Sequence, residues 1–445
     1  MSALVQSKLV TALPLLADAD LARCFAWRNG APVSAGEFIG DVETLAKLLP
    51  AAHYAMNLCA DRYRFLVAFC AAALAGQTSL LPSSRTPQTV AETLHAYSGS
   101  YALSEQALEP APSRQFVLPQ DLASHASTNV PEIPAQHVIA IAFTSGSTGQ
   151  PKANIKTWSS FCASSALNAQ LLCDQHAPHI VATVPPQHMY GLELSVLLPL
   201  RSRAAVHVGQ PFFPADIARA LQSVPGPRLL VTTPVHLRAL LRAAPALPEL
   251  AAIVSATAPL DRELAAEIER RYGTRVIELF GSTETCVIAH RRAAHDEPWR
   301  LYADISLHPQ PDGTLVDAPY FAGPAALQDI VELLPERRFT LCGRNSDLLE
   351  IAGKRASLGD LTRRLLAIPG VEDAVVFVLD PDPTGISRLA ALVVAPDLRE
   401  NDVLCMLRQS IDPVFLPRPL RCVAALPRNA TGKLPRDALL AALQC

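Results

Sequence analysis

The sequence lacks an excess of charge of either sign. Among 445 residues, lysine and arginine number 38 and aspartate and glutamate 41, a formal net charge of -3. A protein that binds along a nucleic-acid backbone needs a basic excess, so we expect no nucleic-acid partner. Charged residues make up 18% and hydrophobic residues 50% of the chain. This composition excludes a disordered or collagen-like protein.

Clustered cysteines and long apolar runs are also missing. The ten cysteines form no CxxC pair and no Cys/His group at zinc-site spacing. We expect reduced, mostly buried thiols, the alternative being a disulfide framework that a chain of this size does not need. The longest apolar run, residues 65–76, is shorter than the ~20 residues that cross a bilayer. With no convincing signal-peptide pattern, the sequence predicts a cytoplasmic protein without a membrane span.

Glycine is scarce relative to proline, 20 against 38, which predicts many rigid loop entries. Apolar β-branched runs followed by helical periodicity predict an α/β fold with parallel sheets, at whose strand ends ligands collect. After about Gly343 the units become smaller and predict an α+β domain. We therefore predict two domains, residues 1–345 and 346–445. The runs that we expect to form strands are residues 138–143, 179–184, 229–232, 253–255 and 275–280.

The segment TSGSTGQPK directly follows one of these predicted strands. Glycines let backbone amides approach an anion, while hydroxyls and a lysine add donors, so the segment predicts a phosphate-binding loop. The order GxxxxGK[ST] of a P-loop is absent. A flexible Ser/Gly loop is the alternative. The residues concerned are Thr144, Ser145, Gly146, Ser147, Thr148, Gly149 and Lys152.

Five further motifs follow in order: PPQHMYG, SATAPL, ELFGSTET, an aspartate 15 residues before the arginine of a GR pair, and NATGK. Together with TSGSTGxPK, they resemble the acyl-adenylate-forming superfamily, which comprises acyl- and aryl-CoA ligases, luciferases and adenylation domains of nonribosomal synthetases. The resemblance covers most of the chain. It implies a large multilayer α/β N-terminal domain that binds ATP and a carboxylic acid, and a small mobile α+β lid that carries a catalytic lysine.

The resemblance implies roles for individual residues at the nucleotide. The loop from Thr144 to Lys152 holds the β- and γ-phosphates of ATP. Thr283 contacts the α-phosphate, and Glu284 binds Mg²⁺, a cation that suits a carboxylate beside phosphate oxygens. Phe280 presents an aromatic face to adenine in place of the family's usual tyrosine. The remaining positions at the nucleotide are Ser255, Ala256, Glu278, Gly281, Asp329 and Arg344.

Further positions concern the ribose, the catalytic lysine of the lid and the hinge. Asp329 and Arg344 have the family spacing of the pair that grips the ribose, although Asp329 taken alone is better interpreted as a surface acid. Lys433 of NATGK resembles the lysine that bridges the carboxylate and the α-phosphate, where a cation stabilises the developing charge. The alternative is a solvated lysine. Ser346 occupies the family's hinge position.

The acid and its acceptor are less constrained. His188 resembles the histidine that flanks the acyl pocket, with a plain loop histidine as the alternative. Tyr190 stands where amino-acid-activating members place an aspartate, which disfavours an amino-acid substrate, while nearby Glu193 keeps that alternative open. The short chain resembles the hydroxybenzoate-activating ligases of xanthomonadin and aryl-polyene pigment clusters.

Such an enzyme forms acyl-AMP and pyrophosphate and then transfers the acyl group to a thiol. The acceptor implied is coenzyme A or the phosphopantetheine of a separate acyl carrier protein. A ligase of medium- or long-chain fatty acids is the alternative substrate class. A non-catalytic nucleotide-binding relative is the alternative from another class, although it would have no use for a mobile lysine.

Overall fold

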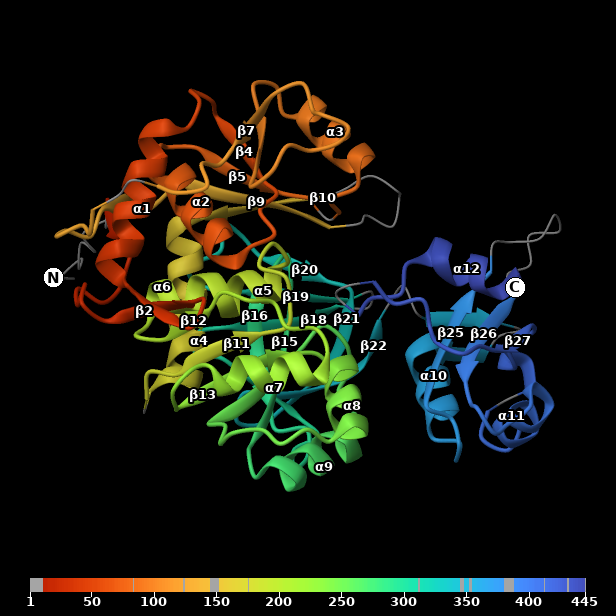
Figure 1. The fold of residues 1–445 in the computed structure, drawn as a ribbon. Coiled ribbons are helices and arrows are strands. Elements are labelled where there is room, and N and C mark those ends of the chain that lie inside the picture. Colours follow the sequence, from red (N-terminus) through yellow and green to blue (C-terminus); the bar gives the residue numbers. More distant parts are fainter. Residues whose placement is uncertain are drawn as a thin grey trace, which may run out of the picture. The chain divides into compact units, whose positions relative to one another are not determined.

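The protein consists of two compact units in the computed structural model (Figure 1). Unit 1 comprises Met1–Ile305 and Ala318–Ala322, and unit 2 comprises Ser306–Asp317 and Gly323–Cys445. The predicted hinge position, Ser346, lies outside the described residues, and the domain division at 345/346 stays a prediction. The structure describes residues 11–82, 84–122, 125–144, 152–174, 176–310, 313–344, 348–351, 354–379, 388–411, 413–429 and 432–444.

A first mixed sheet in unit 1 has the strand order β10-β9-β5-β4-β6-β7. Its strands pair in parallel except for β9 and β10, which form an antiparallel pair. Because β4 pairs with β5 on one side and β6 on the other, the chain reverses its winding direction at β4. The strands are β4 (Tyr54–Asn57), β5 (Thr78–Leu81), β6 (Tyr101–Ser104), β7 (Gln115–Val117), β9 (Val138–Thr144) and β10 (Lys152–Thr157).

The helices of this region begin at well-formed N-caps. Ser34 and Glu37 form a capping box at the start of α1 (Ala35–Leu48), and the Asp61 carboxylate accepts from the Arg64 amide at the start of α2. Helix α2 (Arg62–Leu74) is apolar on nearly all sides and is buried, as its alanine-rich sequence predicts. The other elements here are α3 (Pro87–Ala96) and the antiparallel strands β1 (Ala12–Pro14) and β8 (Glu132–Pro134).

A second sheet forms the centre of unit 1, in the order β17-β16-β15-β14-β13-β11-β12-β2-β3. Strands β2 and β11–β15 run parallel to one another. The strands that flank this group, β3 on one side and β16 and β17 on the other, pair in antiparallel fashion. The strands are β2 (Cys24–Arg28), β3 (Ala31–Ser34), β11 (His179–Ala182), β12 (Ala205–His207), β13 (Arg228–Thr232), β14 (Ala252–Ser255), β15 (Val276–Ser282), β16 (Cys286–Arg291) and β17 (Trp299–Leu301).

Helices cover this second sheet (Figure 1). Apolar residues of α7 (Pro214–Gln222), α8 (Pro234–Ala243) and α9 (Arg262–Tyr272) form one core cluster with Val181, Leu230, Ile253 and Val276 of the sheet. Elsewhere in unit 1, a nearly continuous helical segment packs against α4 and lies next to β11 and β16. The elements involved are α4 (Trp158–Cys173), α5 (Met189–Leu192), a π-helix (Glu193–Leu197) and α6 (Leu198–Arg201).

Unit 2 contains small antiparallel elements and an α+β sandwich. The sheet β25-β26-β27 has α10 and α11 packed on one face and α12 on the other. Residues of β26 alternate between the two cores, Ala391 and Val393 facing one and Ala390 and Leu392 the other. The helices are α10 (Leu358–Leu366), α11 (Glu400–Leu407) and α12 (Arg436–Gln444), with a 3₁₀ turn at Pro413–Phe415. The strands are β18 (Ser306–Gln310), β19 (Gly313–Asp317), β20 (Ala325–Leu327), β21 (Asp329–Leu334), β22 (Arg338–Arg344), β23 (Leu348–Ile351), β24 (Lys354–Ser357), β25 (Asp373–Val378), β26 (Leu389–Val394) and β27 (Leu420–Cys422).

The predicted α/β fold, with a large N-terminal part and a smaller α+β C-terminal part, is confirmed. Five of the predicted strands correspond to β9, β11, β13, β14 and β15, with boundaries that shift by one or two residues. Among the described cysteines, Cys59, Cys70, Cys162 and Cys286 are buried. Over the described part of the chain, every helix is too short or too polar to span a bilayer.

Candidate active site

The parallel strands of the second sheet bring polar residues to one edge. Strands β13, β14 and β15 are in register, so that Thr232 lies beside Ser255 and Ser255 beside Glu278. The hydroxyl of Thr232, the last residue of β13, lies 3.0 Å from that of Thr183, the residue after β11. This edge is where ligands bind in α/β folds. The predicted residues Ser255, Ala256, Glu278, Phe280 and Gly281 therefore come together here.

Two buried polar atoms of this region have no hydrogen-bond partner within the described residues. They are the Ser255 hydroxyl oxygen and Nε2 of His236 in helix α8. Nδ1 of the same histidine lies 2.9 Å from the Thr233 hydroxyl. Buried polar groups are normally paired, so these atoms fit a strand edge whose hydrogen bonds are completed by a ligand such as a nucleotide.

The predicted phosphate loop joins β9 to β10. Thr144 at the end of β9 pairs with Lys152 at the start of β10, so the loop closes an antiparallel hairpin. The Asn154 side-chain amide stabilises its base by donating to the Ala142 and Lys152 carbonyls, both at 3.3 Å. Lys152 is exposed. The predicted residues Ser145, Gly146, Ser147, Thr148 and Gly149 lie outside the described residues.

Thr283 and Glu284 lie in the tight turn between β15 and β16, where Ser282 pairs with Cys286. The Ser282 amide donates to the Thr285 hydroxyl at 3.1 Å, and the Thr285 amide donates to the Ser282 hydroxyl at 3.2 Å. A Cβ atom on Gly281 would lie 2.1 Å from the Cys286 carbonyl oxygen. The turn therefore requires glycine at 281 and holds the two predicted α-phosphate and Mg²⁺ residues in a defined place.

A single carboxylate in such a turn fits Mg²⁺. The described residues contain no group of three or more histidines, cysteines or acids that could form a cage around a metal. Mg²⁺ is commonly held by one or two carboxylates together with substrate phosphates rather than by a cage of protein ligands. Glu284 would hold the ion, which neutralises phosphate charge when bound.

Glu278 and Phe280 lie two residues apart on β15 but have different surroundings. The Phe280 ring lies against Trp299, with ring centroids 5.2 Å apart. The buried Glu278 carboxylate accepts from the Arg291 guanidinium at 2.7 Å and from the Leu260 amide at 2.8 Å. Burial raises the pKa of Glu278 and the Arg291 charge opposes that rise. Glu278 thus links β15 to the SATAPL loop, and its predicted contact with the nucleotide stays a prediction.

Removal of the Arg291 charge should destabilise unit 1. We expect Arg291→Met to lower the free energy of unfolding by about 3 kcal/mol, because it leaves the buried Glu278 charge without its partner. Denaturant titration measures the change. The control is Arg270→Met, which breaks an exposed pair with Glu267 at 3.7 Å and should cost less than about 0.5 kcal/mol. Equal values for the two variants would contradict this role for Arg291.

The HMYG segment forms the start of the helix that follows β11. His188 precedes α5 and is half-buried. A Cβ on Gly191 would lie 2.0 Å from the Pro185 carbonyl oxygen, so this glycine is required for close packing. The Tyr190 hydroxyl lies 3.1 Å from the Thr232 carbonyl and 2.9 Å from the Val254 carbonyl. Tyr190 therefore stabilises the ends of β13 and β14, next to the edge that carries Ser255.

The predicted residues of unit 2 lie in two places. Asp329 and Arg344 are directly opposite each other in the β21–β22 pair, so their 15-residue spacing is that of a hairpin. Lys433 is exposed, and its amide donates to the Asn429 side chain at 2.9 Å. Next to Asn429, the guanidinium of Arg428 pairs with Asp373 of β25 at 2.8 Å. The predicted catalytic lysine thus stands on a loop that is fixed to the sheet of unit 2.

Sequence reasoning missed three buried residues in unit 1. Lys156 on β10 is buried, and its ammonium donates to the Glu284 carbonyl at 2.7 Å. The buried Arg62 guanidinium, whose pKa is lowered to about 10 by burial, donates to the Ala182 and Val184 carbonyls. The third is His236. For Lys156, the alternation of the strand could have indicated its burial. Lys156 shares a strand face with Asn154, and the apolar residue between them, Ile155, faces outward.

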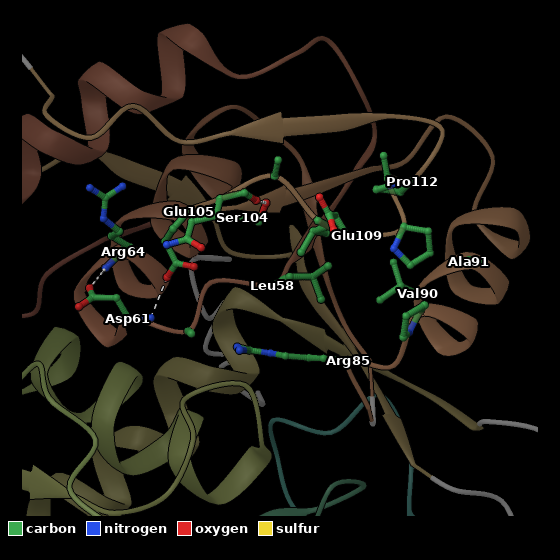
Figure 2. Close-up of a pocket in the computed structure, with 17 residues that line it drawn as sticks. Leu58, Asp61, Arg64, Arg85, Val90, Ala91, Ser104, Glu105, Glu109 and Pro112 are labelled. Carbon is green, nitrogen blue, oxygen red and sulfur yellow. Dashed lines mark hydrogen bonds between the residues drawn. The ribbon is translucent and has the colours of Figure 1, made fainter.

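A cavity of about 670 Å³ lies where β4 and β6 end, at the reversal of winding in the first sheet (Figure 2). Figure 2 shows Asp61, Arg64 and Glu105 toward one end and Val90 and Ala91 toward the other. None of the predicted site residues lines it. The Arg85 guanidinium, on its wall, donates at 3.1 Å to Gln187, the residue before His188. One hydrogen bond thus links the wall of the cavity to the residue that precedes the HMYG segment.

Parallel strands with hydroxyls at their ends, a hairpin at the predicted phosphate loop and a turn with a carboxylate are the features that the sequence predicted for an adenylate-forming enzyme. The family comparisons agree. Residues 49–311 match the AMP-binding enzyme family, and residues 363–433 match the AMP-binding enzyme C-terminal domain. The chain belongs to the AMP-binding enzyme family. It is an AMP-forming acid–thiol ligase.

Curated relatives and solved structures are consistent with this assignment. The 4-coumarate–CoA ligase of Rhodobacter capsulatus is 32% identical over 66% of this chain and 74% of its own length. The 3-hydroxybenzoate–CoA/4-hydroxybenzoate–CoA ligase of Thauera aromatica is 25% identical over 68% and 66%, respectively. The fold resembles that of o-succinylbenzoate-CoA synthetase from Bacillus subtilis, with a TM-score of 0.82 and 19% identity over 97% of this chain and 98% of that one.

Proposed function

We propose that the protein activates an aryl carboxylic acid of the hydroxybenzoate type with ATP and transfers the acyl group to a thiol. The relatives from Rhodobacter capsulatus and Thauera aromatica are named for aryl acids, which supports this class of substrate. A solved structure of an anthranilate CoA ligase with a bound aryl adenylate, 16% identical, has the same fold, with a TM-score of 0.79. The step in pigment biosynthesis that the sequence suggests stays a prediction.

The structural observation that supports an acid other than an amino acid is the environment of Glu193. This side chain is 1% exposed and accepts hydrogen bonds from Ser164, Asn168 and the Val287 amide. Its carboxylate is buried and already has three protein donors, which argues against a role as the partner of a substrate α-ammonium group. Tyr190, at the neighbouring position, is also committed to backbone carbonyls. This favours an acid without an amino group over an amino acid.

The proposed reaction has two steps. A substrate carboxylate oxygen attacks the α-phosphorus of ATP, a P–O bond forms, and pyrophosphate leaves. Lys433 stabilises the charge that develops on the pentacoordinate phosphorus, and Thr283 donates to the same phosphate. A thiolate then attacks the acyl carbon of the adenylate, AMP leaves, and the thioester remains. His188 would contact the acid and keep its carboxylate in line with the phosphorus.

Exchange of pyrophosphate into ATP tests the first step without a thiol. We expect hydroxybenzoates to support the fastest exchange in a panel with cinnamates, medium- and long-chain fatty acids and amino acids. A fatty acid or an amino acid as the best substrate would refute the aryl proposal. Absence of exchange with every acid would refute adenylation itself and favour a nucleotide-binding protein without turnover.

The acceptor is tested separately with purified acyl-AMP. We propose coenzyme A or the phosphopantetheine of a separate acyl carrier protein, since the CoA ligases among the relatives use the first. Thioester formation is measured with each at equal concentrations. A carrier protein that outcompetes coenzyme A identifies a protein partner, whereas transfer to neither thiol would refute the second step.

A further inference from the structure

Strand β10 buries a lysine and exposes an isoleucine. Lys156 is 5% exposed, whereas its neighbour Ile155 is 65% exposed. Because successive residues of a strand face opposite sides, a shift of one residue would bury the isoleucine and free the lysine. The register with β9 instead keeps the ammonium inside, at a cost in solvation. Apolar packing therefore does not explain why Lys156 is buried and Ile155 is exposed.

The buried ammonium makes one contact that concerns the reaction. Lys156 Nζ donates to the Glu284 carbonyl oxygen at 2.7 Å. Glu284 and Thr283 form the turn between β15 and β16, and β10 directly follows the predicted phosphate loop. A single side chain therefore connects the strand behind the phosphate loop to the turn that would hold the α-phosphate and Mg²⁺.

A second buried charge holds the other side of the same turn. Both carboxylate oxygens of Glu193 lie 3.1 Å from the Val287 amide on β16, just after the turn. The Ser164 hydroxyl and the Asn168 amide donate to the same carboxylate at 2.9 and 3.3 Å. Burial raises the pKa of Glu193, and the Lys156 charge is among the groups that lower it. Lys156 and Glu193 thus contact the two sides of one turn, at Glu284 and at Val287.

Glu193 also connects this turn to the acyl side of the site. It opens the π-helix Glu193–Leu197, which continues α5 and the segment that carries His188. Single π-helical turns are uncommon and are often found at functional sites. Lys156 and Glu193 therefore tie three predicted parts of the site, the phosphate hairpin, the HMYG segment and the Thr283–Glu284 turn, to one another.

We propose that Lys156 and Glu193 form a buried pair of positioning residues that fixes the Thr283–Glu284 turn for adenylation. This inference rests on the proposed function. A buried pair that only stabilised the fold could be replaced by apolar side chains of similar size without a loss of rate. A positioning pair behaves differently, because misplacing a reacting group by 1 Å can cost about 100-fold in rate.

The test compares three variants with the wild-type protein. Lys156→Met removes the ammonium and keeps the stem, and Lys156→Met with Glu193→Leu removes both charges and leaves none unpaired. Ile155→Met on the outward face of the same strand is the matched control. For each folded variant, kcat and KM are measured in pyrophosphate exchange at several Mg²⁺ concentrations, and thermal unfolding is measured in parallel.

We expect kcat to fall at least about tenfold in Lys156→Met and in the double variant, with the KM for the acid near its wild-type value. The double variant should unfold at a higher temperature than Lys156→Met, because it leaves no uncompensated buried charge. Ile155→Met should behave as wild type. If Lys156→Met does not fold, the double variant decides the question alone.

A folded double variant with wild-type kcat would overturn the proposal, since the pair would then serve only the fold. Failure of the proposed function has a different signature, namely no exchange by the wild-type protein with any acid. In that case the affinity for ATP with Mg²⁺, measured by calorimetry, still tests the pair. Weaker binding by the double variant than by Ile155→Met supports positioning, and equal binding refutes it.

Discussion

Alanine in place of Lys433 should slow formation of the acyl-adenylate by about 1000-fold, the upper range for removal of one group that stabilises a developing charge. The reason is that a carboxylate and a phosphate, both anionic, must approach each other while charge grows on phosphorus. Lys433 is exposed on a loop held by Asn429, so the substitution should leave the fold intact. Pyrophosphate exchange measures the first step.

The second step distinguishes this role from a general loss of activity. Transfer from supplied acyl-AMP to the thiol involves no attack on phosphorus, so Lys433→Ala should lower it by less than about tenfold. Lys47→Ala, which removes an exposed lysine in the last turn of α1, serves as the control for loss of a surface charge. An equal loss of both steps in Lys433→Ala would contradict a role confined to adenylation.

Gly281→Ala should lower the rate of adenylation by about 100-fold, because a methyl group at this position cannot be accommodated without movement of the turn. Its Cβ would lie 2.1 Å from the Cys286 carbonyl oxygen and 2.8 Å from the Val287 Cα. These are backbone atoms, which cannot rotate away as a side chain can. The shift would pass directly to Thr283 and Glu284, and pyrophosphate exchange measures the loss.

A second glycine provides the comparison. A Cβ on Gly323 would meet no atom within 4 Å, so Gly323→Ala should leave the rate near the wild-type value. Circular dichroism and thermal unfolding show whether Gly281→Ala remains folded. A folded Gly281→Ala protein with full activity would mean that the turn tolerates displacement and that Thr283 and Glu284 need no fixed position.

Local signals predicted the strands that carry the site. Each of β9, β11, β13, β14 and β15 is a short apolar run that ends in polar or small residues, a pattern that depends on neighbouring residues alone. The motifs at the strand ends could be recognised in the same way. The Asp329–Arg344 spacing corresponds to a hairpin that places the two residues opposite each other, and their contact with the ribose stays a prediction.

Long-range contacts account for what the sequence did not predict. Lys156 and Glu193 contact the turn at Glu284 and Val287, which lie more than 90 residues away along the chain, and nothing near either residue indicates these contacts. Glu193 was considered as a partner for a substrate ammonium group, whereas the structure gives it buried protein donors. Unit 2 likewise includes Ser306–Asp317, a segment that no local pattern in the sequence assigns to it.

The β21–β22 hairpin has a consequence for recognising distant members of this enzyme class. Leu334 pairs with Arg338, and the turn between them is the only connection between the two strands that carry Asp329 and Arg344. Residues added equally to both strands would lengthen the hairpin and keep the aspartate and arginine opposite each other, whereas one residue inserted in one strand would turn the arginine to the other face. Searches that require a fixed distance between the two would therefore miss relatives with longer hairpins, and a pattern defined by strand pairing would retain them.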